Sequence, residues 1–220
     1  MAEAIIQAKL GADIIVAQGT EAGGHGTTES TTFCLVPQVA AALKELEKSV
    51  GRPILTVAAG GIVDGHGLAA ALSLGADGVL MGTRFFASHE SPEPEKSKAA
   101  VVAISEGAGT LRTRTWDVLS GGFWPKKYDG RAIRNAASNR HAGRERALEE
   151  EYEKDPAKWR ETALIYTKQK KAYQFDEAAL WAGAGAVKKI DSVENIINQT
   201  LSEASSIIKQ NHDLLLASKL

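Results

Sequence analysis

The sequence has little cysteine, little net charge and no long apolar run, and each shortage argues against a class of protein. A single cysteine, Cys34, allows neither an internal disulfide nor a multi-cysteine metal site, and it fits a reducing compartment. Twenty-six basic and 27 acidic residues give a net charge of -1, which argues against electrostatic binding of nucleic acid. No apolar run reaches the roughly 18 residues of a membrane span. We therefore expect a cytoplasmic protein with no nucleic-acid or membrane partner.

Glycine, in contrast, is plentiful and unevenly spread along the 220 residues. Thirteen of the 21 glycines lie in residues 1–84, and eight lie in the remaining 136. The first part has the glycine-punctuated pattern of alternating strands and helices, whereas the rest is rich in charged residues and alanine, which favours helices. We expect an α/β region over residues 1–110 and a mainly helical region over residues 111–220 that packs on it.

Three short apolar runs, at residues 13–18, 54–58 and 76–81, have the character of strands. A helical pattern at residues 2–10 precedes the first run, and helical patterns at residues 35–50 and 65–74 separate the three runs. Strands that alternate with helices in this way predict a parallel sheet with right-handed crossovers. The first run is apolar at consecutive positions, which predicts a strand buried on both faces.

The stretch from Ala17 to Thr27 follows the first strand directly and holds four glycines and His25. Its composition predicts a loop in which the backbone can approach a ligand closely. Histidine is the usual general base near neutral pH, so His25 is the leading candidate for acid–base chemistry, with a loop histidine bonded to backbone as the alternative. Gln18 ends the strand, and its amide can both donate to and accept from the edge of a heterocycle.

Two further glycine-rich turns follow the second and third strands. Gly60 and Gly61 form the first of these turns, and Gly82 and Thr83 form the second. Backbone amides at neighbouring strand ends, together with the start of a helix capped by Asp64, predict a phosphate site, with simple tight turns as the alternative. No dinucleotide-binding or P-loop pattern is present.

The remaining polar and aromatic residues favour structural roles. Glu21 is expected to orient or cap the loop in which it lies. The five histidines have no metal-ligand spacing, so we expect no metal site. The tryptophans are expected to pack rather than bind, although Trp124 lies in a glycine turn where it can line a pocket; they are Trp116, Trp124, Trp159 and Trp181.

Three motifs in order resemble the nitronate monooxygenase family, formerly called 2-nitropropane dioxygenases. They are Ala17–His25 (AQGTEAGGH), Ala58–Ile62 (AAGGI) and Gly75–Phe85 (GADGVLMGTRF), and they cover roughly residues 1–90. The later segments Asp117–Leu119 with Trp124–Pro125, and Trp181–Gly183, are similar to the C-terminal part of the same family, more weakly.

The resemblance implies an oxidoreductase that binds FMN on a TIM barrel and oxidises alkyl nitronates with dioxygen to a carbonyl compound and nitrite. By motif match, His25 is the catalytic base, and Gln18 and Gly23 contact the flavin. The residues expected to hold its phosphate end are Gly60, Gly61, Leu80, Met81, Gly82 and Thr83. The expected substrates are a nitronate or nitroalkane and dioxygen.

A (β/α)₈ barrel has eight strands in about 250 residues, and this sequence predicts three. We therefore expect a partial barrel, the last three βα units, followed by a mainly helical C-terminal region. Such a truncated chain is expected to bind FMN weakly and to self-associate through open barrel edges. Two alternatives remain, a flavin-dependent enoyl-thioester reductase and an inactive remnant that only associates with other chains.

Overall fold

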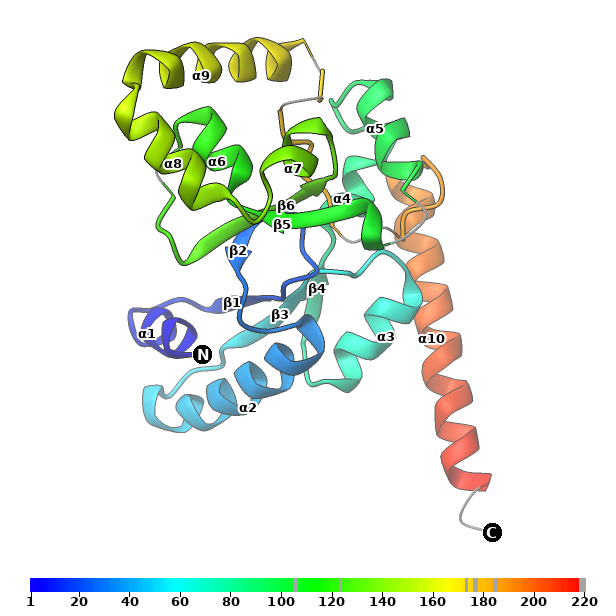
Figure 1. Cartoon of the computed structure of the whole chain (residues 1–220). Helices are drawn as coiled ribbons and strands as arrows, with labels where there is room; N and C mark the ends of the chain where they lie inside the picture. Colours follow the sequence, from blue (N-terminus) through cyan, green and yellow to red (C-terminus); the bar gives the residue numbers. More distant parts are fainter. Residues whose placement is uncertain (105–106, 123, 173, 176–177, 184–185, 218–220) are drawn as a thin grey trace. The chain divides into compact units, whose positions relative to one another are not determined.

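The computed structural model in Figure 1 describes residues 1–104, 107–122, 124–172, 174–175, 178–183 and 186–217. The chain forms two compact units. The first unit comprises Met1–Glu21, Glu29–Ser91 and Ile190–Leu220, and the second comprises Ala22–Thr28 and Pro92–Lys189. Within the described ranges, no helix combines the length and apolar character that crossing a membrane requires.

The first unit has the predicted parallel sheet. Its three strands lie in the order β1-β3-β4, and they are β1 (Ile14–Gln18), β3 (Leu55–Ala59) and β4 (Gly78–Leu80). The helices of this unit are α1 (Ala2–Lys9), α2 (Thr32–Val50), α3 (Gly65–Ser73), α4 (Gly82–Phe86) and α10 (Val193–Ala217). The first three strands and helices alternate along the chain as the apolar runs predict, so the predicted α/β class is confirmed.

One face of this sheet is covered and the other is exposed. Helices α1 and α2 pack on the covered face, where Ile15 and Ala17 of β1 join the core. The opposite face carries Ile14, Val16 and Leu55, which are 54%, 45% and 44% exposed. The prediction that β1 is buried on both faces is therefore wrong for this chain, because the two helices that pack on β1 lie on one side of it.

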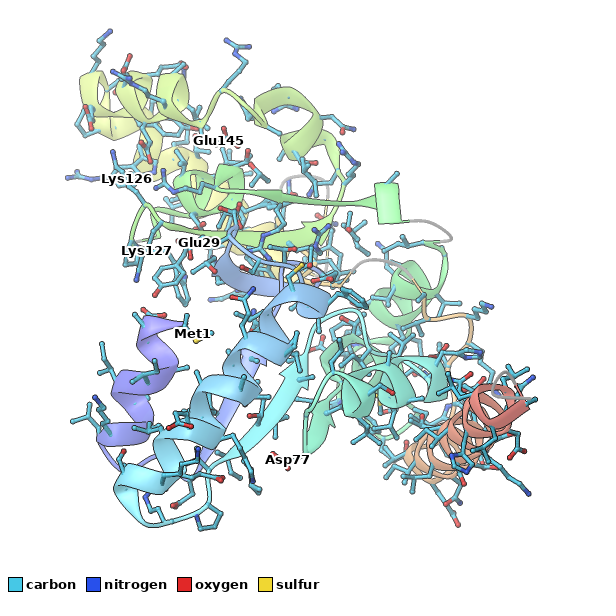
Figure 2. All side chains as sticks on the ribbon, turned by 90° about the horizontal axis from the view of Figure 1, so that it is seen from below. Met1, Glu29, Asp77, Lys126, Lys127 and Glu145 are labelled. Atoms are coloured by element: carbon cyan, nitrogen blue, oxygen red, sulfur yellow. The ribbon has the colours of Figure 1, made fainter. Side chains whose placement is uncertain are left out.

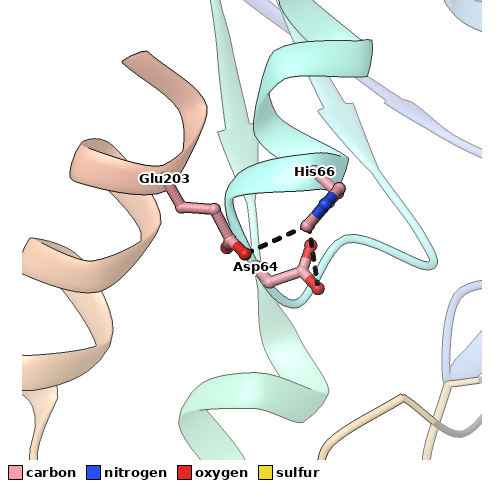
Figure 3. Close-up of side chains that lie close together, drawn as sticks. All are labelled: Asp64, His66 and Glu203. Atoms are coloured by element: carbon pink, nitrogen blue, oxygen red, sulfur yellow. Dashed lines mark ion pairs between the residues drawn. The ribbon is translucent and has the colours of Figure 1, made fainter. Parts of the chain in front are cut away.

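Helix α10 packs along α3, and a polar cluster joins the two helices at the start of α3 (Figures 1 and 3). Glu203 Oε2 accepts from the Gly65 amide at 2.8 Å, and Glu203 Oε1 lies 3.1 Å from His66 Nδ1. Asp64 is the N-cap of α3 and accepts from the Gly67 amide. These carboxylates complement the positive end of the α3 dipole, which also disfavours a cation there. The cluster therefore joins α10 to α3.

Helix α2 begins without a side-chain cap from its own N-cap residue, Thr31. The cap comes instead from Glu21, whose carboxylate accepts from the Thr32 amide at 2.8 and 3.0 Å and from the Thr32 hydroxyl at 3.0 Å. The interpretation of Glu21 as a structural residue is thereby confirmed.

Glu21→Gln is expected to lower the free energy of unfolding by about 1 kcal/mol, because the amide loses the charge that favours a helix N-terminus. Denaturant titration followed by far-ultraviolet circular dichroism measures this loss. The matched control is Glu29→Gln in the same connection, whose side chain is exposed. Equal stabilities of the two variants would contradict the capping role.

The second unit is built on an antiparallel sheet that the sequence does not predict. Its strands lie in the order β2-β6-β5, and they are β2 (Gly24–Thr27), β5 (Thr110–Thr113) and β6 (Tyr128–Ile133). Its helices are α5 (Glu95–Val102), η1 (Gly107–Gly109), α6 (Thr115–Ser120), α7 (Ala136–His141), α8 (Glu145–Lys154) and α9 (Pro156–Lys171). Part of the predicted glycine–histidine loop is therefore strand β2, because its backbone pairs with β6 about a hundred residues later.

Candidate active site

The predicted site residues divide between the two units. Gln18, Gly60, Gly61 and the run from Leu80 to Thr83 belong to the first unit, whereas Gly23 and His25 belong to the second.

The first set lies along one edge of the parallel sheet. The strand registers pair Gln18 with Ala59 and Ala59 with Leu80, so the carboxyl ends of three strands are neighbours. Gly60 and Gly61 follow β3 with φ angles of +109° and +73°, which side chains rarely tolerate. The two glycine turns are therefore side by side, as expected.

The motif match puts the phosphate end of a flavin at this edge. Phosphate needs converging backbone amides without side chains in the way, and a Cβ built at Gly82 would meet nothing within 4 Å. Gly61 and Gly82 are both exposed. The start of α3 contributes less than the sequence suggests, because the amides of Gly65 and Gly67 already donate to carboxylates of the protein. The phosphate role of this edge stays a prediction.

In the second unit, the position of Gly23 requires a glycine for packing reasons. A Cβ there would lie 2.5 Å from the carbonyl carbon of Ala182 and 2.6 Å from the Gly183 nitrogen, both backbone atoms. Two residues later, His25 lies in β2 opposite Gly130 of β6. Arg112 of β5 donates to the Gly26 carbonyl at 2.9 Å, which ties β2 to the rest of the sheet.

His25 forms a close pair with Asp117 of helix α6. The distance between His25 Nε2 and Asp117 Oδ1 is 2.7 Å. The His25 side chain is 16% exposed and that of Asp117 is 5% exposed. An imidazole held by a buried carboxylate has the arrangement of a general base, since the carboxylate orients the ring and stabilises its protonated form.

Two tryptophans form walls around the imidazole. Trp124 stacks on His25 with ring centroids 4.1 Å apart and planes 8° apart, and Trp181 lies tilted at 4.7 Å. Trp181 reaches this position because Gly130 has no side chain: a Cβ there would lie 2.2 Å from the Trp181 ring. Trp116 then contacts Trp181 edge-on at 5.8 Å. Both tryptophans therefore pack against His25, and a pocket lined by Trp124 stays a prediction.

The electrostatics of Asp117 reflect its burial. Burial raises the pKa of the Asp117 carboxyl, while the hydrogen bond and charge of His25 and the charge of Arg114 act in the opposite direction. Sequence reasoning missed Asp117 because it lies 92 residues from His25 along the chain. The available signal was the weak resemblance of the segment Asp117–Leu119 to the family's C-terminal part.

Glu145, the first residue of α8, braces the turn that leads into the helix of Asp117 (Figure 2). It accepts hydrogen bonds from the hydroxyls of Thr113 and Thr115. Burial acts to raise the pKa of Glu145, but these bonds and those from its own amide and the Gly143 amide outweigh burial and lower it.

Because the pKa of Glu145 is lower in the folded state, its ionised form stabilises the fold. This contribution is fully present above the pKa of an unfolded glutamate, about 4.3. It is lost as the pH falls through the folded-state pKa. Glu145→Gln is therefore expected to be less stable than the wild type at pH 7, with the difference shrinking below about pH 4.3. Denaturation at a series of pH values measures it, with the exposed Glu153→Gln of the same helix as control. A difference independent of pH would contradict this role.

Comparison with known proteins places these features in a family. The family model for nitronate monooxygenase matches residues 1–203. The nitronate monooxygenase of Neurospora crassa is 35% identical over 205 residues, which are 91% of this chain and 50% of that protein. Curated relatives of this kind match most of this chain, but the chain spans only about half of their length.

Two solved structures are similar in fold. FabK from Thermotoga maritima matches with a TM-score of 0.72 and 30% identity, over 97% of this chain and 61% of that one. The nitroalkane oxidase from Streptomyces ansochromogenes matches with a TM-score of 0.70 and 27% identity, over 96% and 56%. With the family match over residues 1–203 and the predicted motifs inside it, the chain belongs to the nitronate monooxygenase family.

Proposed function

We propose that the chain takes part in the oxidation of alkyl nitronates by dioxygen to a carbonyl compound and nitrite, with FMN as cofactor. The observation that carries this proposal is the pair of His25 and Asp117 between aromatic walls, in a chain whose family relatives are nitronate monooxygenases. We further infer that β1, β3 and β4 with their helices are three βα units of a (β/α)₈ barrel, as the similarity to the nitroalkane oxidase structure supports.

In this function His25 takes the proton from the carbon next to the nitro group of a neutral nitroalkane, which converts it to the nitronate. Asp117 balances the charge of the imidazolium that results. Trp124 and Trp181 limit the access of water to the ring, since they lie against it.

The motif match supports two sets of flavin contacts, one in each unit. FMN, when bound, supplies the electron transfer between nitronate and dioxygen. In the first unit, Gln18 would contact the ring system, and the backbone of Gly60, Gly61, Leu80, Met81, Gly82 and Thr83 would hold the phosphate. In the second unit, Gly23 is a flavin contact by the motif match alone. The cytoplasmic location of the protein, which its composition suggests, also stays a prediction.

The test is oxygen uptake and nitrite release by the purified chain with FMN and ethylnitronate. We expect uptake that depends on both the nitronate and the flavin, with nitrite as a product. Flavin-loaded protein that leaves the nitronate unchanged would contradict the proposal.

A second candidate is the flavin-dependent enoyl-thioester reductase, which the similarity to FabK favours. Oxidation of a reduced nicotinamide with an enoyl thioester, without nitronate turnover, would select it.

The exposed apolar sheet face with Ile14, Val16 and Leu55 also supports the predicted self-association, because uncovered apolar surface of this kind favours contact with another chain. Size-exclusion chromatography over a range of concentrations tests that prediction.

A further inference from the structure

We propose that the second unit has a separate binding site for a small aromatic carboxylate, in a pocket between helices α6, α8 and α9. These three helices pack on one another (Figure 1), and the pocket among them has a volume of about 280 Å³. Sites for drug-sized molecules begin at about 300 Å³, so the ligand is a small one. Neither His25 nor Asp117 lines this pocket, and the inference does not depend on the proposed function.

One wall of the pocket is aromatic and is held in place by the protein. Trp159 of α9 donates from Nε1 to the Val118 carbonyl of α6 at 2.8 Å, which fixes the position of the indole ring. Tyr152 of α8 lies nearly parallel to that ring, with the planes 17° apart and the centroids 6.3 Å apart. A preformed apolar wall of this kind suits the flat apolar part of a ligand, because little side-chain freedom is lost on binding.

The rim of the pocket has more hydrogen-bond donors than the protein uses. Arg114 Nη2 lies 2.8 Å from Glu149 Oε1, and Lys126 Nζ lies 3.6 Å from Oε2 of the same carboxylate. One carboxylate therefore serves two cations, which between them have eight N–H groups. The other carboxylate that lines the pocket, Glu153, is exposed to water. A surplus of donors at two cations favours a ligand with a carboxylate of its own.

The Nε atom of Arg114 lacks an acceptor. It is buried, and among the residues that the structure describes no group accepts its hydrogen. A buried N–H without an acceptor costs stability, which points to an acceptor that the described residues do not supply. The side chain as a whole is 21% exposed, so its guanidinium is accessible from the pocket. Because a carboxylate can accept from two guanidinium nitrogens at once, Arg114 is the expected anchor of the ligand.

NMR of the nitrogen-labelled chain tests the site, because the indole N–H of Trp159 reports on the pocket. The probes are 3-phenylpropionate, the amide of the same shape, and 3-phenylpropylamine. We expect the carboxylate to shift the Trp159 resonance with a Kd of about 1 mM, as its size allows. The amide should bind about tenfold more weakly, since it has no charge, and the amine should not bind. The resonance is assigned by its loss in Trp159→Phe.

Charge changes at exposed side chains identify the groups that the carboxylate contacts. Lys126→Gln removes a cation and should weaken binding of 3-phenylpropionate about threefold, whereas Glu153→Gln removes a repelling charge and should strengthen it about twofold. Lys127→Gln is the matched control, because this neighbour is exposed and does not line the pocket. Arg114→Lys keeps the charge but loses the planar fork, and it should weaken binding about tenfold.

The absence of a saturable shift at Trp159 would overturn the proposal, and so would a shift confined to Trp124 and Trp181 beside His25. Equal affinities for the carboxylate and the amide would show an apolar pocket without an anion site, which also contradicts it. Tighter binding of the amine, or an affinity that Lys126→Gln leaves unchanged, would do the same. The two exposed variants and the three probes give this answer even if Arg114→Lys does not fold.

Discussion

Replacing His25 by asparagine is expected to lower kcat/KM for a neutral nitroalkane by about 10²–10⁴-fold, the usual contribution of a positioned general base. Asparagine keeps the approximate size of the side chain but has no lone pair basic enough to take a proton from carbon. Oxidation of the preformed nitronate should change little, because that substrate has already lost the proton. Oxygen uptake with nitroethane and with ethylnitronate measures both quantities on one preparation.

The control for this experiment is His212→Asn on the exposed end part of α10, which should behave as the wild type with both substrates. If His25→Asn loses both activities equally, the residue holds the site together rather than serving as its base. If it loses neither, His25 has no part in the reaction.

Gly19→Ala is expected to destabilise the first unit by about 3 kcal/mol or more, the upper range for overpacking a buried position. A Cβ at residue 19 would lie 2.1 Å from the Thr32 nitrogen, 2.2 Å from its hydroxyl and 2.6 Å from a Glu21 carboxylate oxygen. The methyl group would therefore both clash with backbone and displace the cap of α2, so two sources of stability are lost together.

Gly78→Ala is the matched control for Gly19→Ala, because a Cβ at Gly78 in the same sheet would meet nothing within 4 Å. Its free energy of unfolding should stay close to that of the wild type. Denaturant titration of both variants, followed by far-ultraviolet circular dichroism, makes the comparison. Similar losses in the two variants would show that the space beside Gly19 can open at little cost.

The parallel sheet of the first unit could be predicted because its signals are local. Each strand is an apolar run closed by glycine, and each following helix has its own stop signal, so the order of elements can be read residue by residue. The cap that Glu21 provides for α2 is also a local feature, since Thr32, which donates to it, lies 11 residues away in the sequence. What the local pattern does not show is whether a second layer covers the sheet, and the exposed Ile14 and Val16 were therefore expected to be buried.

The antiparallel sheet of the second unit and the Asp117 partner of His25 have no such local signal. Strand β2 is Gly-His-Gly-Thr, a composition typical of loops, and its pairing with β6 depends on residues far along the chain. The chain enters the second unit twice, at residues 22–28 and 92–189, whereas the sequence pattern suggests one division after residue 110. Composition changes along a chain mark such boundaries only when each domain is one continuous segment.

The ring of Trp181 fills the space that a side chain at residue 130 would occupy. The order in which a lineage can change these two positions is therefore constrained. Trp181 must become smaller before residue 130 can become larger, and an ancestor that took the steps in reverse order would pass through an overfilled core. A smaller residue in place of Trp181 also removes one of the rings that contact His25. We therefore expect changes at residues 130 and 181 only in sequences where His25 is no longer needed as a base.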